Sequence, residues 1–298
     1  METIERQSVI KANRIATFIC TVIFLFSLGV ALTIDSVVLL LDSAGWLIGV
    51  ITGILYEKVI KTIKKPPSAR YHFGYAKIEP LSINIEALLI LGACFFTIKM
   101  GIQDIIHPDE VKGYGLAIGL TLGTGIIGLI VSRYLKVMGK KNNSPLLEVN
   151  AFAWFVDSVF AFGVCGGFVI AGFLSGIGHK TAAAYIDPVM GIILALVLVP
   201  APFKMLKNHV GELLDENPGG AEEQQINEII NQFKDKWGMR GIKSLRIRKA
   251  GTKYFIDVCF HADSEQHVED TIKSVRLLEN DLQGPLKQVD VGVRFEIG

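Results

Sequence analysis

Four polar side chains lie within long apolar stretches of the sequence, and their oxygen atoms could bind a cation. Asp157 lies well inside one such stretch, and Asn150 is seven residues earlier, two helical turns away on the same face. Asp42 and Glu86 interrupt two other apolar stretches. A carboxylate inside a bilayer costs on the order of 3 kcal/mol or more unless it is paired, hydrated or protonated, so such residues are functional by default. Oxygen-only ligation favours hard ions such as Mg²⁺, Mn²⁺ or Fe²⁺ over zinc, which prefers His and Cys.

Each of the four residues also has a structural interpretation. Asp42 and Asn150 could equally well cap or bridge helices, and Glu86 is the weakest of the four candidates. For Asp157 we expect contact with a permeating ion or proton in preference to a buried structural partner. The predicted metal ligands are therefore Asp157, Asp42, Asn150 and Glu86.

The elements that carry these residues are predicted to cross a membrane. Half of the 298 residues are hydrophobic and the mean hydropathy is +0.43. Residues 15–34 and 114–132 contain no charged residue, and each run is long enough, at about 1.5 Å per residue, to cross an apolar layer of about 30 Å. We expect six transmembrane helices, over residues 12–34, 36–60, 78–106, 113–137, 145–176 and 184–206.

Charged residues between the predicted helices indicate the orientation. Lys and Arg gather before the first helix, after the second and after the fourth, whereas acidic residues such as Asp35 and Asp104 predominate on the other side. The positive-inside rule then places both termini in the cytoplasm. An even number of spans agrees with this, because it puts both termini on the same side of the membrane. We expect an integral protein of the plasma (inner) membrane.

The composition changes near residue 208, which divides a membrane domain (1–208) from a charged tail (209–298). Residues 221–236 and 268–282 have helical spacing of apolar residues, and strands are expected near 242–249, 252–261 and 288–297. The order αββαβ predicts an α+β ferredoxin-like domain with two helices on one face of a three-stranded sheet.

The sequence gives little support to other classes of protein. A net charge of +1 argues against nucleic acid as a partner, and the four scattered cysteines (Cys20, Cys94, Cys165 and Cys259) indicate neither a disulfide frame nor a zinc knot. We recognise no nucleophile–base pair, phosphate-binding loop or redox motif. We therefore expect neither an enzyme nor a bound cofactor.

The connection after the second predicted helix, Tyr71-His-Phe-Gly-Tyr-Ala-Lys-Ile-Glu79, resembles the cytoplasmic signature of the cation diffusion facilitator (cation efflux) family. Gly101-Ile-Gln near the end of the third helix, Asp187-Pro188 and Leu213-Leu-Asp215 agree with other landmarks of that family. Six spans followed by a ferredoxin-like cytoplasmic domain is the layout of the whole family. The resemblance therefore covers nearly the full chain.

The resemblance also implies where a transport site would lie. The family carries two ligands four residues apart in the second helix and two more in the fifth, so that four ligands can surround a zinc-like ion. These positions are Gly45 and Gly49 in the second helix and, in an alignment without gaps, Ala153 and Asp157 in the fifth, so three of the four ligand residues differ from the family pattern. A competing alignment moves Asp42 by three residues onto the first ligand position, but we prefer to place it at the acidic position that precedes the ligand in many relatives. The row Gly45, Gly49 and Gly53 is also typical of close helix packing, and packing and ion passage remain open alternatives for it.

The accessory metal sites of the family are depleted as well. Lys243, Cys259, Arg294 and Glu296 align with tail positions where metal-binding relatives carry His or Asp. His261 and His267 remain as possible ligands, but we expect a tail without metal.

Two functions follow from the resemblance. The first is a homodimeric secondary transporter that exports a divalent cation from the cytoplasm in exchange for protons. The alternative is a transport-incompetent relative that serves as a membrane scaffold or partner subunit. Lys77 and Asp215 resemble a charge interlock of the family, which we expect to pair across the cytoplasmic face of the dimer.

Overall fold

The computed structural model describes the backbone of residues 2–63, 65–107, 113–142, 145–237, 239–251, 253–262, 268–286 and 289–297. The chain forms two compact units. The membrane unit comprises residues 1–61 and 85–204, and the tail unit comprises residues 62–84 and 205–298. The connection between the second and third helices therefore belongs to the tail unit.

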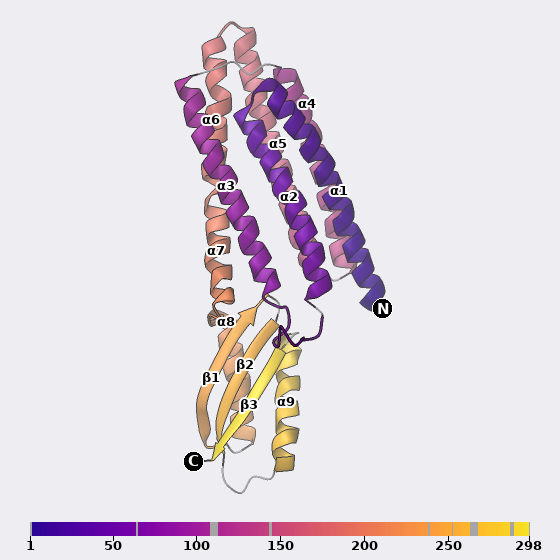
Figure 1. Ribbon diagram of the computed structural model, residues 1–298, viewed down its shortest axis with the longest axis vertical. Helices are drawn as coiled ribbons and strands as arrows, with labels where there is room; N and C mark the ends of the chain where they lie inside the picture. The colour runs from indigo at the N-terminus through magenta and orange to yellow at the C-terminus, as the bar shows by residue number, and fades with distance from the viewer. Residues whose placement is uncertain are drawn as a thin grey trace. The chain divides into compact units, whose positions relative to one another are not determined.

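Long helices make up the first two thirds of the chain (Figure 1). Within the described residues, six helical segments are long and apolar enough to cross a membrane, which confirms the predicted fold class. Successive spans run in opposite directions in Figure 1, and α7 continues in the direction of α6. The helices are α1 (Glu2–Ile34), α2 (Val37–Thr62), α3 (Ile78–Ile106), α4 (Tyr114–Lys141), α5 (Pro145–Gly176), α6 (Lys180–Leu198) and α7 (Pro200–Leu213).

The sixth span differs from its predicted limits. It begins at Lys180, four residues earlier than expected, and divides into α6 and α7 at Val199. Pro200 and Pro202 follow this break, and proline has no backbone N–H to donate to the preceding turn. The apolar sequence continues through Val199, so periodicity alone does not reveal the interruption.

Two of the apolar clusters in the membrane unit join the same four helices, and a third contains Leu41, Cys94 and Ala195. One joins α1, α2, α4 and α5, and it contains the ring pair of Trp46 and Trp154, whose centroids are 5.4 Å apart. The other lies among α1, α2, α4 and α5 further along the helices and includes Leu39 and Phe168. Large apolar side chains such as Phe18 and Phe95 are about two-thirds exposed, as expected of surfaces that face lipid tails.

The tail has the predicted order αββαβ. Its elements are α8 (Gly220–Lys236), β1 (Gly241–Ala250), β2 (Lys253–Ala262), α9 (Val268–Leu286) and β3 (Val289–Ile297). The sheet order is β1-β2-β3, with β1 antiparallel and β3 parallel to β2. Because a parallel connection needs a crossover, α9 lies between β2 and β3 in the sequence.

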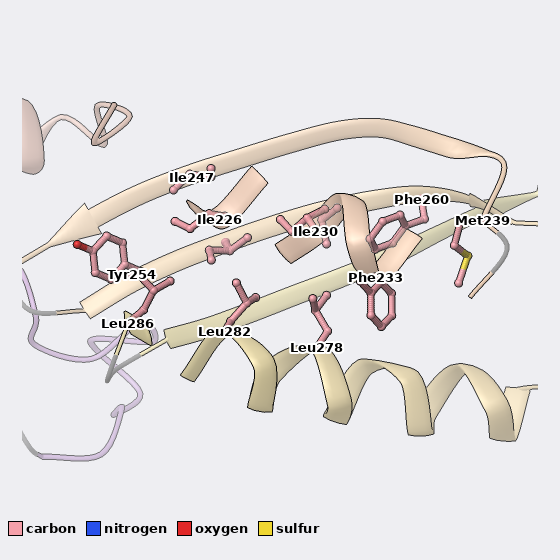
Figure 2. Packing of buried hydrophobic residues seen from close by; sticks show 12 residues of the cluster. Ile226, Ile230, Phe233, Met239, Ile247, Tyr254, Phe260, Leu278, Leu282 and Leu286 are labelled. Atoms are coloured by element: carbon pink, nitrogen blue, oxygen red, sulfur yellow. The ribbon is translucent and has the colours of Figure 1, made fainter. Parts of the chain in front are cut away.

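The core of the tail forms where both helices meet the sheet (Figure 2). In β2, every second residue from Tyr254 to Phe260 belongs to this core, which places the side chains of Tyr254, Ile256, Val258 and Phe260 on the face toward the helices. The helices contribute Ile226, Ile230, Phe233, Leu278, Leu282 and Leu286.

Candidate functional site

Asp157 lies in the middle of α5 and is exposed in the single chain. No hydrogen-bond donor among the described residues reaches its carboxylate, although the negative charges of Asp42 and Glu86 are close enough to act on it. Cys20 of α1 is a further electrostatic neighbour. Asp157 is therefore a carboxylate whose oxygens are available to a ligand.

Asp42, half-buried in α2, is held by neighbouring side chains. Its Oδ2 accepts a hydrogen bond from Trp46 Nε1 at 3.0 Å and another from Ser27 Oγ at 3.2 Å. The first bond lies within one turn of α2, and the second joins α1 to α2. Asp42 thus bridges helices, as its structural interpretation allows, while its Oδ1 accepts no bond among the described residues.

Glu86 is also half-buried and occupies α3. Its Oε2 accepts a hydrogen bond from the hydroxyl of Tyr56 in α2 at 3.0 Å. The bond orients the carboxylate toward α2 and leaves its other oxygen for further contacts.

Asn150 lies near the beginning of α5 and is partly buried. Its Nδ2 donates to Oδ1 of Asn13 at 3.4 Å, and Asn13 Nδ2 donates in turn to the carbonyl oxygen of Gly53 at 2.9 Å. Asn13 is only 2% exposed. Sequence reasoning did not single out Asn13, although a lone amide at the start of an apolar helix is a signal that could have found it.

The three glycines of the α2 row, Gly45, Gly49 and Gly53, differ in their surroundings. A Cβ at Gly53 would lie 2.2 Å from Thr17 Oγ1, and one at Gly49 would lie 2.8 Å from Cys20 Sγ. A Cβ at Gly45 would meet no atom within 4 Å. The row therefore packs against α1 at two positions and is open at the third.

The predicted ligands converge only in part. Asp42, Glu86 and Asp157 are near enough for their charges to interact, whereas Asn150 contacts Asn13. Over the ranges that the structure describes, no three His, Cys, Asp or Glu side chains are close enough together to hold a metal ion. The four side chains therefore form no closed cage of ligands among the described residues.

A second polar region lies at the other end of the membrane unit. Asp187 of α6 is 2% exposed, and it accepts hydrogen bonds from Ser36 Oγ at 2.6 Å and from the Val37 N–H at 2.8 Å. It therefore caps the N-terminus of α2. A cavity of about 80 Å³ lies beside it, lined by Asp35, Val37, Leu40, Met100, Asp104, His107, Asp187 and Pro188.

The tail positions that align with metal ligands hold a charge pair. Lys243 Nζ forms a short ion pair with Glu296, and its hydrogen bond lowers the pKa of the Glu296 carboxyl. Cys259 lies beside Arg294 in the register of β2 and β3. His261 is opposite Glu296, and His267 lies outside the described residues. A protonated lysine has no lone pair to offer a metal ion, and here it occupies the carboxylate of Glu296.

The signature connection is fastened to the tail by ionic contacts within one chain. Lys77 Nζ lies 3.0 Å from Asp215 Oδ1 and donates to the Leu213 carbonyl at 2.9 Å. Arg248 of β1 also donates to Asp215 Oδ1 at 2.9 Å, and its guanidinium lies over the rings of Phe73 and Phe255. The expected charge pair therefore forms inside a single chain and has a third member, Arg248.

Comparison with known proteins agrees with this architecture. The family model described as the cation efflux transmembrane domain matches residues 14–214, and the one described as the cation efflux protein cytoplasmic domain matches residues 218–296. The chain is similar to the cation-efflux pump FieF of Salmonella arizonae (strain ATCC BAA-731 / CDC346-86 / RSK2980) and of Salmonella newport (strain SL254). Each is 24% identical over 210 residues, which span 70% of this chain and 66% of the relative.

Among solved structures, the chain is similar to the nickel form of a single-residue variant of the MamM CTD, at 22% identity. That match covers 26% of this chain and 98% of the other, with a TM-score of 0.23. A second variant of the MamM CTD is 23% identical over 26% of this chain and 96% of its own, again with a TM-score of 0.23. Because the transmembrane family model alone matches more than half of the residues, the chain belongs to the cation efflux family of membrane transporters.

Proposed function

We propose that this chain exports a divalent cation from the cytoplasm in exchange for protons. The observation that carries the proposal is Asp157, a carboxylate inside a membrane helix that no described donor satisfies. Asp42 and Glu86 add negative charge near it. A cation would relieve the repulsion among these groups, and protons could replace the cation when it leaves.

The donor atoms favour a hard ion as the substrate. Asp42, Asn150, Glu86 and Asp157 offer only carboxylate and amide oxygens, which suit Mn²⁺, Fe²⁺ or Mg²⁺ better than Zn²⁺. A Cβ at Gly45 would meet no atom within 4 Å, and this open position supports an ion that keeps part of its hydration shell. The substrate is therefore expected to be bound loosely and partly through water.

The tail is cytoplasmic, and six spans then place the N-terminus on the same side, where Arg14, Lys58 and Lys61 also lie. We infer that the protein is a homodimer of the plasma membrane. A tail of the cation efflux cytoplasmic type supports dimerisation.

A transport-incompetent scaffold is the second candidate, and one observation favours it. Cys20 occupies the space that a ligand side chain at Gly49 would need, so part of the family site is closed by helix packing. In that case Asp157 would be a remnant of the site.

Flux measurements in proteoliposomes separate the two functions. Purified full-length protein is tested with Mn²⁺, Fe²⁺, Mg²⁺ and Zn²⁺ under an imposed pH gradient, while a trapped dye follows the lumenal pH. We expect Mn²⁺ or Fe²⁺ flux with opposing proton movement, and its loss in Asp157→Asn. Glu148→Gln, which changes an exposed carboxylate of the same helix, is the matched control and should keep its flux. Absence of flux with all four ions would favour the scaffold.

A further inference from the structure

Asn13 and Asn150 place two amide groups against each other at one end of the membrane unit. Asn13 is six residues into the first span, Asn150 is five residues into α5, and Gly53 is nine residues before the end of α2. Because α2 runs opposite to α1 and α5, these positions lie at a similar depth, near the end that carries the N-terminus. The proposed orientation makes this the cytoplasmic end.

The bond between the two amides is weak. Asn13 uses Nδ2 for a good hydrogen bond to the Gly53 carbonyl, but its Oδ1 receives Asn150 Nδ2 at 3.4 Å, which is long for such a bond. Oδ1 of Asn150 receives no hydrogen bond among the described residues. Two amide oxygens are therefore present where apolar side chains would need no polar partner. Oδ1 of Asn13 accepts one weak hydrogen bond, and Oδ1 of Asn150 accepts none among the described residues.

Charged side chains close to this pair already bind one another. Glu57, one turn beyond Gly53, accepts two hydrogen bonds from Arg14, at 2.8 and 2.6 Å, and pairs with Lys61. This acid is thus already neutralised by cations, and the amide oxygens provide polar atoms without net charge. Neutral oxygens bind a divalent cation weakly, which permits both entry and release.

We propose that Oδ1 of Asn13 and Oδ1 of Asn150 form an inner subsite, through which a hard divalent cation passes between the cytoplasm and Asp157. Asn150 and Asp157 lie on the same face of α5, about 10 Å apart along the helix axis, so one step joins the two sites. A rotation of the Asn150 amide exchanges its weak bond for a metal–oxygen contact, while Asn13 keeps its bond to Gly53. The subsite rests on the proposed export function. It provides an entry point for the cation, to which α1 contributes Asn13.

The test uses Mn²⁺ as the probe and binding as the first readout. Full-length protein carrying Asp157→Asn is titrated with Mn²⁺ in detergent and followed by electron paramagnetic resonance. We expect weak binding that Asn13→Leu or Asn150→Leu abolishes and that Asn13→Asp tightens at least tenfold. Asn13→Asp adds a charged oxygen but removes the Nδ2 donor, so a purely structural bridge would suffer from it as much as from Asn13→Leu.

A matched control accounts for lost packing. Ser132 is buried and donates to the Ala151 carbonyl at 2.7 Å, so Ser132→Ala also removes one bond between helices. It should lower the melting temperature without changing Mn²⁺ affinity. With Asp157 intact, Asn13→Leu and Asn150→Leu should raise the KM for Mn²⁺ flux several-fold with a smaller change in kcat.

The outcomes distinguish this subsite from the transport function. If Asn13→Asp and Asn13→Leu lower the melting temperature equally and neither changes Mn²⁺ affinity, the pair is only a bridge and the subsite is wrong. If flux depends on Asp157 but not on either asparagine, the subsite again fails while export stands. If no ion is transported but the Mn²⁺ affinities change as expected, the subsite stands and the export function fails.

Discussion

Gly45, Gly49 and Gly53 recur every four residues along α2, but their surroundings assign them different roles. Thr17 and Cys20 of α1 fill the space beside Gly53 and Gly49, so these two glycines let the helix backbones approach. Gly45 has no such neighbour. At the residue scale, helix packing explains two positions of the row and leaves one open beside the candidate site.

This difference predicts unequal effects of alanine. Gly53→Ala should destabilise the membrane unit by about 1–3 kcal/mol, because its Cβ would overlap Thr17. Gly45→Ala should leave stability unchanged or raise it by up to about 1 kcal/mol, because alanine is the better helix former and space is available. Denaturation of purified protein by increasing SDS, followed by tryptophan fluorescence, measures both changes. Equal losses for the two variants would show that α2 is sealed along the whole row.

The polar residues of the site could be predicted from the sequence, but their partners could not. Asp42, Glu86, Asn150 and Asp157 are recognisable because polar side chains are rare in apolar runs. Ser27 and Trp46 donate to Asp42, Tyr56 donates to Glu86, and Asn13 accepts from Asn150. Three of these four bonds join different helices. Which helices lie side by side is not encoded in the local periodicity of any one of them.

At the scale of elements, the connection between α2 and α3 is part of the tail unit. Ala76 packs with Ala250 and Phe255 of the hairpin between β1 and β2, and the Gly251 N–H donates to Glu212 Oε2 at 2.9 Å. Asp215 adopts a left-handed backbone conformation with φ of 62°, which is uncommon for a residue other than glycine. These contacts hold the start of α3 and the end of α7 to the same small sheet.

The ion pairs of Asp215 lead us to predict how the stability of this junction depends on pH. Burial alone would raise the pKa of its carboxyl, but hydrogen bonds and charges from Arg248 and Lys77 outweigh burial and lower it. Its folded pKa is therefore below the unfolded value of about 3.9, so its stabilising contribution is complete above that value and is lost as the pH falls through the folded pKa. Asp215→Asn should flatten the fall in melting temperature in this acidic range and destabilise the neutral protein by at most about 1 kcal/mol.

A charge exchange provides the control for this prediction. Lys77→Asp with Asp215→Lys should stay less stable than the wild type, because Arg248 would then face a lysine. Adding Arg248→Glu should recover part of the loss. Full recovery in the two-residue exchange would mean that Arg248 contributes nothing to the junction.

The boundaries of the helices and strands show where the spacing of apolar residues is sufficient to predict an element. The third span is predicted at residues 78–106 and is observed at Ile78–Ile106, because charged or polar connections bound it on both sides. The sixth is divided at Val199, where prolines interrupt an otherwise continuous apolar run. β1 extends one residue beyond its predicted range at each end and β2 one residue at its C-terminal end, because hydrogen bonding in the ladder extends past the apolar alternation. The predicted first residues of the second and third strands, 252 and 288, lie outside the described residues.

At the scale of the whole molecule, the tail has a core that is independent of the rest of the chain. All the residues of its main cluster lie between Ile226 and Phe295, and both helices and all three strands contribute to it. The connection at residues 62–84 adds only Ala76 to a small second cluster with Ala250 and Phe255. Residues 210–298 should therefore fold when expressed alone.

We expect this isolated tail to be soluble and dimeric, with a melting temperature that does not respond to zinc. A ligand that binds only the folded form, at 100 times its Kd, would add about 2.7 kcal/mol, a shift of many degrees in a domain of this size. Lys243 neutralises Glu296, and the described part of the chain offers no group of three His, Cys, Asp or Glu side chains to hold the ion. Calorimetry with and without excess zinc measures the shift, and ultracentrifugation measures the oligomeric state. A zinc-dependent rise that disappears in Cys259→Ser would instead establish a thiolate site on the open face of the sheet.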